Sequence, residues 1–221
     1  MGKIIVIEGS DGAGKTTQLG LLCEALENMG REYRRLEFPC YSLETSALVR
    51  MYLDGKFGKS ADSVNAYAAS SFFAVDRIGS YLSDWKKDYE SDKILLSGRY
   101  NTSNAIHQGA KLPESEREAF FSWLFDYEYN LLKLPKPDIV IFLDLLPEIA
   151  EKNITSRGEK TDIHEKDREY LRRCYECASE AARALGWVTI SCAEEGEMLS
   201  RERIHEKVMA SVKPVISQKG E

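Results

Sequence analysis

The amino-acid sequence predicts an α/β fold, in which a five-stranded parallel sheet is flanked by helices on both faces to give three layers. Two observations lead to this prediction. Short apolar segments alternate along the chain with longer segments of helical periodicity, and strands that alternate with helices form parallel sheets through right-handed crossovers. A glycine-rich segment over residues 9–16 directly follows the first apolar segment, an arrangement typical of phosphate-binding sheets of this class.

Five apolar segments define the expected strands, which cover residues 3–8, 33–38, 93–97, 138–143 and 187–191. Helical periodicity predicts helices near residues 15–29, 63–88, 114–131, 147–156, 165–185 and 201–212. No repeat and no linker rich in Gly or Ser interrupts this pattern. We therefore expect one domain over residues 1–212 and a frayed tail over residues 213–221. Ligands of parallel sheets bind at the carboxyl ends of the strands, so the residues just after each strand are the first candidates for chemistry.

The segment over residues 9–16 reads G-S-D-G-A-G-K-T and matches the phosphate-binding motif G-x-x-x-x-G-K-[ST]. Its glycines let backbone N–H groups turn toward an anion, and the following helix adds the positive end of its dipole. Lys15 supplies a charge for the β- and γ-phosphates, and Thr16 supplies a hydroxyl ligand for Mg²⁺. We therefore predict a P-loop NTPase fold that binds a nucleoside triphosphate with Mg²⁺. The expected triphosphate-binding residues are Gly9, Ser10, Asp11, Gly12, Ala13, Gly14, Lys15, Thr16 and Thr17.

Composition narrows the class of protein. The formal net charge of −6 argues against a nucleic-acid surface, which needs a basic stripe. No apolar stretch has the length of a membrane span, and we expect no signal peptide and no membrane partner. An odd count of five cysteines suits a reducing compartment, so we expect a cytoplasmic protein. Cys174-x-x-Cys177 has no second pair, and we interpret it as two ordinary helix thiols.

Two segments are candidates for a second substrate site. Phe73 and Arg77 are one helical turn apart, so the pair can stack a base and donate to a carbonyl on its rim. The alternative is a core phenylalanine and a surface ion pair of Arg77 with Asp76. After the third strand comes a polar segment whose side chains at helical spacing would offer donors and acceptors from one face, with a solvated turn as the alternative. These side chains are Arg99, Asn104, His107 and Gln108.

Three short motifs, in this order behind the P-loop, resemble the thymidylate kinases (dTMP kinases). They are F-P-x-Y at residues 38–41, F-x-x-x-R at residues 73–77 and R-Y-x-x-S-N at residues 99–104. The resemblance is good over residues 3–111 and looser over residues 138–191, and the N-K-x-D motif of GTPases is absent. It implies Mg²⁺-dependent transfer of the γ-phosphate of ATP to dTMP, which yields dTDP and ADP, in a homodimer. The segment 63–88 is a candidate for the dimer surface, and a core role is the alternative.

The resemblance also implies roles for single residues. Phe73 would stack on the thymine ring, and Arg77 would donate to its 4-keto oxygen. Arg99 and Tyr41 would hold the phosphate of dTMP. The remaining expected dTMP-binding residues are Phe38 beside the phosphate, Asn104 and Gln108 near the base, and His107 near the sugar, where many relatives carry a tyrosine.

The expected catalytic residues are Lys15, Asp11, Arg99 and Arg157. Asp11 matches a family carboxylate near the 3′-hydroxyl and phosphate of dTMP. Residues 156–165 match the family's lid over the donor phosphates, although their composition alone also fits a solvated loop. One group of these kinases carries an arginine inside the P-loop, where this chain has Gly12. The resemblance therefore implies that the arginine comes from the lid, with Arg157 first and Lys160 as a weaker candidate.

One position departs from the family pattern. The residue before Arg99 is an aspartate in the family and Gly98 here. Two other functions therefore stay open. The chain could be a related P-loop kinase for another nucleotide or a deoxynucleoside, or a catalytically impaired relative that binds nucleotides. Because Lys15, Arg77 and Arg99 are all present, we favour an active dTMP kinase.

Overall fold

A parallel sheet forms the centre of the molecule. The computed structural model describes residues 1–154 and 168–217. Its strands are β1 (Lys3–Gly9), β2 (Tyr33–Leu36), β3 (Ile94–Ser97), β4 (Ile139–Asp144) and β5 (Val188–Ser191). They pair in the order β2-β3-β1-β4-β5, and every pairing in this sheet is parallel. The predicted five-stranded parallel sheet is confirmed.

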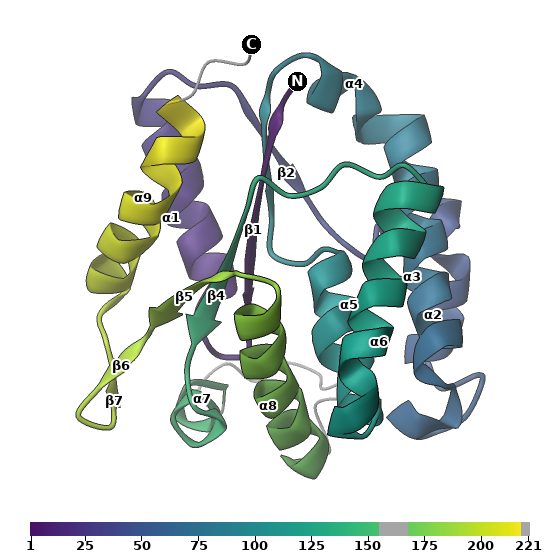
Figure 1. The fold of residues 1–221 in the computed structure, drawn as a ribbon. Coiled ribbons are helices and arrows are strands. Elements are labelled where there is room, and N and C mark those ends of the chain that lie inside the picture. The colour runs from purple at the N-terminus through teal and green to yellow at the C-terminus, as the bar shows by residue number, and fades with distance from the viewer. Residues whose placement is uncertain (155–167, 218–221) are drawn as a thin grey trace.

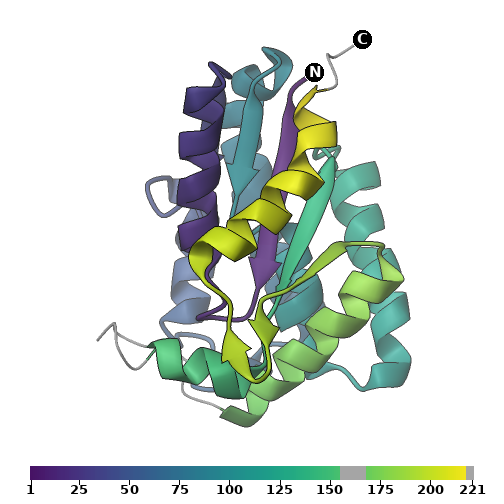
Figure 2. The ribbon, with the colours of Figure 1, turned by 90° about the vertical axis from the view of Figure 1, so that its left-hand side faces the viewer.

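Helices cover both faces of this sheet (Figure 1). On one face lie α1 (Lys15–Asn28) and α9 (Arg201–Ser217), which pack side by side (Figure 2). The other face carries most of the remaining α-helices. They are α2 (Ala47–Leu53), α3 (Ala66–Ser80), α4 (Lys86–Glu90), α5 (Asn101–His107), α6 (Glu114–Phe125) and α8 (Arg168–Ala184). The short α7 (Pro147–Ile154) follows β4, and a small hairpin of β6 (Ala193–Glu194) and β7 (Glu197–Met198) follows β5.

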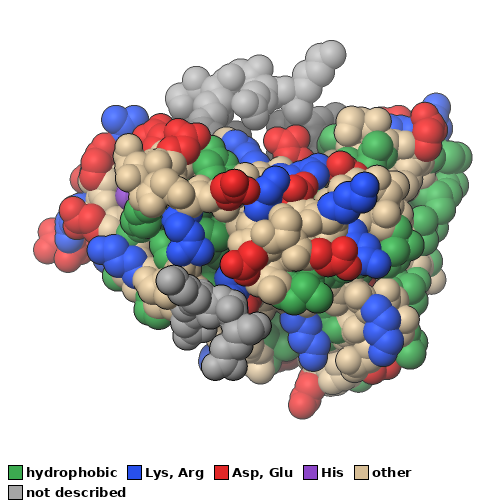
Figure 3. Space-filling model, turned by 90° about the horizontal axis from the view of Figure 1, so that it is seen from above, with side chains coloured by type: hydrophobic (Ala, Val, Ile, Leu, Met, Phe, Trp, Pro, Cys, Tyr) green, Lys and Arg blue, Asp and Glu red, His purple; other side chains and the backbone are tan. Residues whose placement is uncertain are grey.

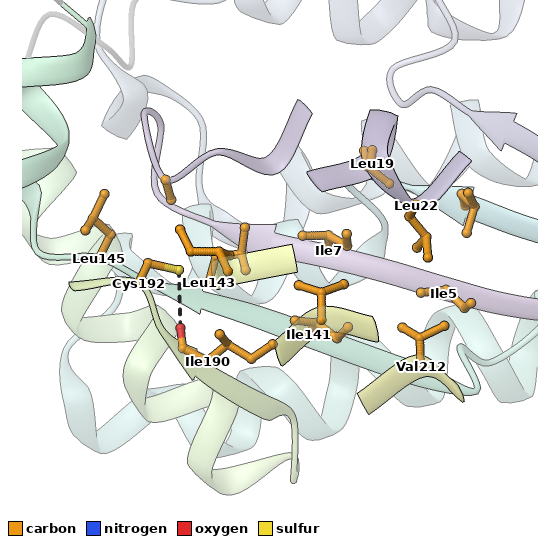
Figure 4. Packing of buried hydrophobic residues seen from close by; sticks show 14 of the residues in the cluster. Ile5, Ile7, Leu19, Leu22, Ile141, Leu143, Leu145, Ile190, Cys192 and Val212 are labelled. Atoms are coloured by element: carbon orange, nitrogen blue, oxygen red, sulfur yellow. Dashed lines mark hydrogen bonds between the residues drawn. The ribbon is translucent and has the colours of Figure 1, made fainter. Parts of the chain in front are cut away.

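Successive apolar side chains of β1 point to opposite faces of the sheet, so helices have to cover both faces. Ile5 and Ile7 point into the core beneath α1 and α9, together with Leu19, Leu22 and Val212 (Figure 4). Ile4 and Val6 point to the opposite face. A strand whose side chains are buried on both sides is typical of the central strand of a three-layer α/β sheet.

Two predicted helices differ from the structure in detail. The segment predicted over 63–88 is α3, then a π-helical turn over Tyr81–Trp85, then α4. The segment predicted over 114–131 is α6 followed by a π-helical turn over Asp126–Leu131. In addition, α2 was not predicted. A period of 3.6 residues marks a helix but carries no signal for a wider turn inside it.

The predicted tail is wrong over residues 213–217, because α9 continues to Ser217 through Pro214. Ile204, Val208, Val212 and Ile216 form one buried stripe at four-residue spacing. Burial of Ile216, together with a hydrogen bond from Arg31 Nη1 to its carbonyl oxygen at 2.5 Å, outweighs the hydrogen bond lost at the proline. Within the described residues, no helix is both long and apolar enough to cross a bilayer.

Candidate active site

The P-loop lies at the carboxyl end of β1, where the strand arrows end at the lower edge of the sheet in Figure 1. Gly12 and Gly14 adopt φ angles of 84° and 93°, which residues other than glycine rarely adopt. These two residues turn the backbone into the start of α1 at Lys15. Gly14 is a glycine of the P-loop pattern, so pattern and conformation agree there, whereas Gly12 occupies a position that the pattern leaves open.

Lys15 folds back onto the loop that precedes it. Its Nζ donates to the carbonyl oxygens of Gly9 at 2.8 Å and Ser10 at 3.0 Å, and it lies 3.2 Å from Asp11 Oδ1. Burial lowers the pKa of Lys15, and the Asp11 carboxylate opposes that effect. The positive charge of Lys15, followed by that of Arg99, lowers the pKa of Asp11 below its usual range, so this carboxylate stays ionised.

A cavity of about 160 Å³ lies beside the P-loop. All eight residues predicted to bind dTMP line it, together with Asp11 of the P-loop. The lining therefore brings together the loop after β2, helix α3, the loop after β3 and helix α5. Four lining residues were not among the predicted ones: Pro39, Leu53, Tyr100 and Ser103.

Arg99 joins this cavity to the P-loop. Its Nη2 lies 3.2 Å from Asp11 Oδ1, the same oxygen that Lys15 contacts. Its Nη1 lies 3.0 Å from His107 Nε2. The Asp11 carboxylate thus sits between one cation of the P-loop and one cation of the cavity.

Arg77 is fixed inside the protein by a partner that the sequence did not reveal. It donates to Glu128 through Nε at 2.7 Å and through Nη2 at 3.1 Å. Although burial opposes its charge, the Glu128 carboxylate raises the pKa of Arg77. The alternative of a surface ion pair with Asp76 is wrong, because Asp76 is buried and accepts from Cys40 N and Thr45 Oγ1, each at 2.8 Å.

Aromatic rings surround the Arg77 end of the cavity. The guanidinium carbon lies 5.4 Å from the ring centroid of Phe38 and 5.3 Å from that of Tyr100. Phe73 meets Tyr52 edge to face, with 6.2 Å between ring centroids. Tyr41 also lines the cavity but keeps 57% of its surface exposed. A flat ring of a ligand would find apolar walls here and a cation at its rim.

Glu8 anchors helix α5 to the sheet. The carboxylate is buried, and it accepts from Thr102 Oγ1 at 2.6 Å and from Ser103 Oγ at 2.8 and 3.0 Å. Burial raises the pKa of Glu8, while these hydrogen bonds and the charge of Arg99 oppose the rise. Glu8 therefore fixes the segment that carries Arg99 and His107 against β1. An acidic residue inside an apolar strand was the sequence signal for this role.

At Gly98 the space for a larger residue is occupied. A Cβ atom added there would lie 2.8 Å from Leu19 Cδ1 of α1. Leu19 itself is buried in the core beneath α1 and α9. The aspartate found in the family at this position would thus require Leu19 to move.

The cysteine pair of α8 consists of two buried thiols. Burial raises the pKa of both Cys174 and Cys177 to about 12. Cys177 Sγ donates to the carbonyl oxygen of Ala105 at 3.3 Å, and Cys174 Sγ lies 3.6 Å from His107 Nδ1. No group of three or more His, Cys, Asp and Glu side chains that could hold a metal occurs in the described part of the chain.

Mg²⁺ fits the donor set at the start of α1. Thr16 offers a hydroxyl oxygen there, and Mg²⁺ prefers oxygen ligands that include phosphates and water rather than a cage of protein side chains. The predicted lid residues Arg157 and Lys160 lie outside the residues that the structure describes.

A P-loop whose aspartate also faces a second, arginine-lined cavity defines a phosphotransferase of the nucleoside monophosphate kinase class. Comparison with known proteins agrees and is more specific. The family model described as thymidylate kinase matches residues 7–204. This chain therefore belongs to the thymidylate kinase family.

Individual relatives resemble the chain over most of its length. The thymidylate kinase of Mycobacterium tuberculosis (strain CDC 1551 / Oshkosh) is 33% identical over 83% of this chain and 87% of its own length. A probable thymidylate kinase of Thermococcus kodakarensis is 30% identical over 97% of this chain and 98% of its own length. The solved thymidylate kinase of Candida albicans has a TM-score of 0.71, covering 97% of this chain and 92% of that chain, at 20% identity. At that identity the structural likeness supports the fold.

Proposed function

We propose that this protein is a thymidylate kinase, which transfers the γ-phosphoryl group of ATP to dTMP and releases dTDP and ADP. The observation that carries the proposal is the contact of Asp11 with both Lys15 and Arg99, since it joins the P-loop to a cavity lined by Phe73 and Arg77. Family membership supports the same reaction. Among the alternatives, it favours dTMP kinase over a kinase for another acceptor.

In the proposed complex, the base of dTMP lies between the apolar walls of the cavity. Phe73 stacks on the thymine ring, and Arg77 donates to its 4-keto oxygen. Glu128 already occupies Nε and one hydrogen of Nη2 of Arg77, so the base would meet the remaining N–H groups of Nη1 and Nη2. Gln108 is buried, and its Oε1 has no hydrogen-bond partner among the described residues. That oxygen would accept from the N3–H of thymine, with Asn104 beside it.

In this proposal, Arg99 and Tyr41 hold the phosphate of dTMP beside Asp11. Phe38, which was predicted beside the phosphate, packs against Arg77 and would lie nearer the base. One oxygen of this phosphate attacks the γ-phosphorus of ATP in line, and the bond from that phosphorus to the β–γ bridging oxygen breaks as ADP leaves. The acceptor is already an anion, so no strong general base is needed. Catalysis then rests on positioning and on neutralising charge, which Lys15 and Arg99 supply.

The residues of the P-loop from Gly9 to Thr17 would hold the phosphates of ATP, and Thr16 would hold Mg²⁺. Bound there, Mg²⁺ neutralises charge on the β- and γ-phosphates. Lys15 would exchange its contacts with the carbonyl oxygens of Gly9 and Ser10 for phosphate oxygens. Arg157 of the predicted lid would add charge at the transferred group.

The test is ADP release in a coupled assay with ATP and Mg²⁺ across dTMP, dUMP, UMP, dCMP, dGMP, AMP and thymidine. The proposal expects dTMP to have the highest kcat/KM, and Lys15→Met to abolish turnover. Turnover that is fastest with another acceptor would support the related-kinase alternative. Nucleotide binding by calorimetry without ADP release on any acceptor would support the catalytically impaired alternative.

We further infer a homodimer formed through α2 and α3. Hydrophobic side chains (green) gather along the right-hand edge of Figure 3, the side on which these helices lie in Figure 1. Four exposed apolar side chains come from this region: Leu48 and Met51 of α2, Val75 of α3 and Leu82 of the adjoining π-helical turn. Leu82 keeps 64% of its surface exposed, a common sign of an interface when its neighbours are apolar too. Sedimentation of the parent and of Val75→Glu/Leu82→Glu tests this, with a dimer expected only for the parent.

We also propose a cytoplasmic location. All five cysteines are free thiols, and a protein without disulfides is typical of a reducing compartment. Fractionation of cells that express the protein would test this location.

A further inference from the structure

His107 lies between Arg99 and Cys174. It is the last residue of α5, and its two ring nitrogens face different partners. Nε2 is 3.0 Å from Arg99 Nη1, and Nδ1 is 3.6 Å from Cys174 Sγ on α8. The imidazole therefore links Arg99, which lines the cavity beside the P-loop, to Cys174 of helix α8.

The chemistry of Arg99 determines the protonation state of His107 in this arrangement. A guanidinium group has only donors and keeps its charge at all ordinary pH values. Nε2 must then accept the hydrogen bond, so it carries no proton. The single proton of the neutral ring lies on Nδ1 and points at the sulfur of Cys174. Because burial raises the pKa of Cys174 to about 12, that sulfur stays a neutral thiol and a weak acceptor.

Other contacts hold this arrangement in place. Tyr170 of α8 donates through its hydroxyl to the carbonyl oxygen of His107 at 2.8 Å. Glu8 holds the first turn of the same helix through Thr102 and Ser103. The second arm of Arg99, Nη2, is 3.2 Å from Asp11. The guanidinium group is therefore held from two sides, by a carboxylate at the P-loop and by an imidazole at α5.

We propose that His107 is a positioning residue, which accepts from Arg99 and aims its guanidinium group at the phosphate of the acceptor, while Cys174 orients the imidazole ring. This inference rests on the proposed function and adds to it, because the resemblance alone implies only a role near the sugar. An arginine that is already oriented loses less conformational freedom when the phosphate arrives. Replacing His107 by a residue that cannot accept a hydrogen bond from Arg99 should therefore weaken the binding of the dTMP phosphate. The binding of the nucleoside part should stay unchanged.

The experiment compares dissociation constants for dTMP and thymidine, measured by calorimetry on the same protein. The ratio of the two constants reports the contribution of the phosphate alone. In His107→Leu, dTMP binding should weaken about tenfold, as expected for one hydrogen bond to a charged group. Thymidine binding should stay close to that of the parent. In His107→Gln, whose amide oxygen can accept from Arg99, most of the lost dTMP affinity should return.

Matched controls separate positioning from general damage. Cys174→Ala should change the ratio in the same direction as His107→Leu but less, because the ring loses only its orienting contact. Cys177→Ala removes the other buried thiol of α8, and His205→Leu removes a histidine of α9 that faces Gln18 instead. Both should leave the ratio unchanged. His107→Asn, with an amide too short to reach Arg99, is a second variant in case His107→Leu does not fold.

Two results would overturn the inference, and a third would refute the proposed function instead. Equal weakening of dTMP and thymidine in His107→Leu would assign His107 to the sugar or to packing. A Gln variant no better than the Leu variant would remove the accepting role. A parent protein that binds ATP but neither dTMP nor thymidine would instead refute the proposed function, so the two failures are distinguishable.

Discussion

Arg77 of α3 and Glu128 form a doubly hydrogen-bonded ion pair that solvent does not reach, with side-chain exposures of 2% and 0%. The two residues come from segments 51 positions apart in the chain. The pair holds Arg77 at the lining of the cavity beside the P-loop. It also connects α3 to the π-helical turn after α6, which carries Glu128.

We expect strong coupling between these two residues. Glu128→Leu leaves a buried guanidinium group without its carboxylate, and should lower the free energy of unfolding by about 3–5 kcal/mol. Arg77→Met should have a cost of similar size. The double variant should be less destabilised than the sum of the two, because neither charge is left alone. Urea unfolding of the four proteins measures this cycle, and additive effects would contradict the expectation.

Gly98→Asp is expected to destabilise the protein, since its Cβ would press on Leu19 Cδ1 at 2.8 Å. Overpacking of this kind costs about 1–3 kcal/mol. In a Leu19→Val background, part of that loss should return. Thermal unfolding of Gly98→Asp, Leu19→Val and the double variant tests the packing. The double variant also tests activity: if the parent shows no transfer and this variant does, Gly98 marks a catalytically impaired relative.

Cys40 offers a readout of dTMP binding that does not depend on turnover. Its neighbours Pro39 and Tyr41 line the cavity, and its thiol is half-buried. Burial raises the pKa of Cys174, Cys177 and Cys192 to about 12, and these thiols should react slowly. A disulfide-exchange reagent should label Cys40 and Cys23 first, and dTMP should slow the labelling of Cys40 alone. Unchanged labelling of Cys40 at saturating dTMP would place the nucleotide elsewhere.

Lys111 should make stability rise in mildly alkaline solution. Burial lowers its pKa from 10.5 to about 8, while Nζ still donates to Tyr52 Oη and to the carbonyl oxygen of Val64, each at 2.9 Å. Between these two pKa values the unfolded chain binds more protons than the folded one, so the free energy of unfolding rises with pH. Relative to Lys111→Met, the parent should gain about 1–2 kcal/mol from pH 7.5 to 10, discounted for residual solvent contact. Urea unfolding of both proteins at these two pH values measures the gain, and a constant difference would contradict it.

Arg157→Ala tests the lid prediction that comes from the resemblance. We expect kcat to fall far more than the affinity for dTMP, because this arginine is proposed to act on the transferred group. Lys160→Ala is the comparison, with a smaller expected loss. Steady-state kinetics together with dTMP binding separates the two effects, and a kcat equal to that of the parent would refute the assignment.

The strands and the P-loop were predictable from local pattern, and part of the cavity lining followed from short motifs and from the resemblance that they carry. β1 is apolar on both faces, which predicts a central position in the sheet. It ends directly at a glycine-rich loop, which predicts phosphate binding at that loop. The motifs around Phe73 and Arg99 were likewise short and contiguous. For the P-loop and for these motifs, the residues that support the prediction are close neighbours in the sequence.

Long-range partners were not predictable in this way. Nothing around Glu128 distinguishes it from the other acidic residues of its segment, and only the packing of α3 against the turn after α6 makes it the partner of Arg77. The end of α9 was different, because the four-residue spacing from Ile204 to Ile216 continues past residue 212 in the sequence itself. This apolar stripe was the local signal that the helix extends beyond the predicted end.

The shared carboxylate of Asp11 has a consequence for the order in which ligands arrive. Lys15 and Arg99 both contact the same oxygen atom of Asp11. A ligand that moves one of these cations away from Asp11 therefore changes the electrostatic potential at the other cation. Occupancy of the nucleotide loop and of the neighbouring cavity is then thermodynamically linked. By reciprocity, each ligand must alter the affinity of the other by the same factor.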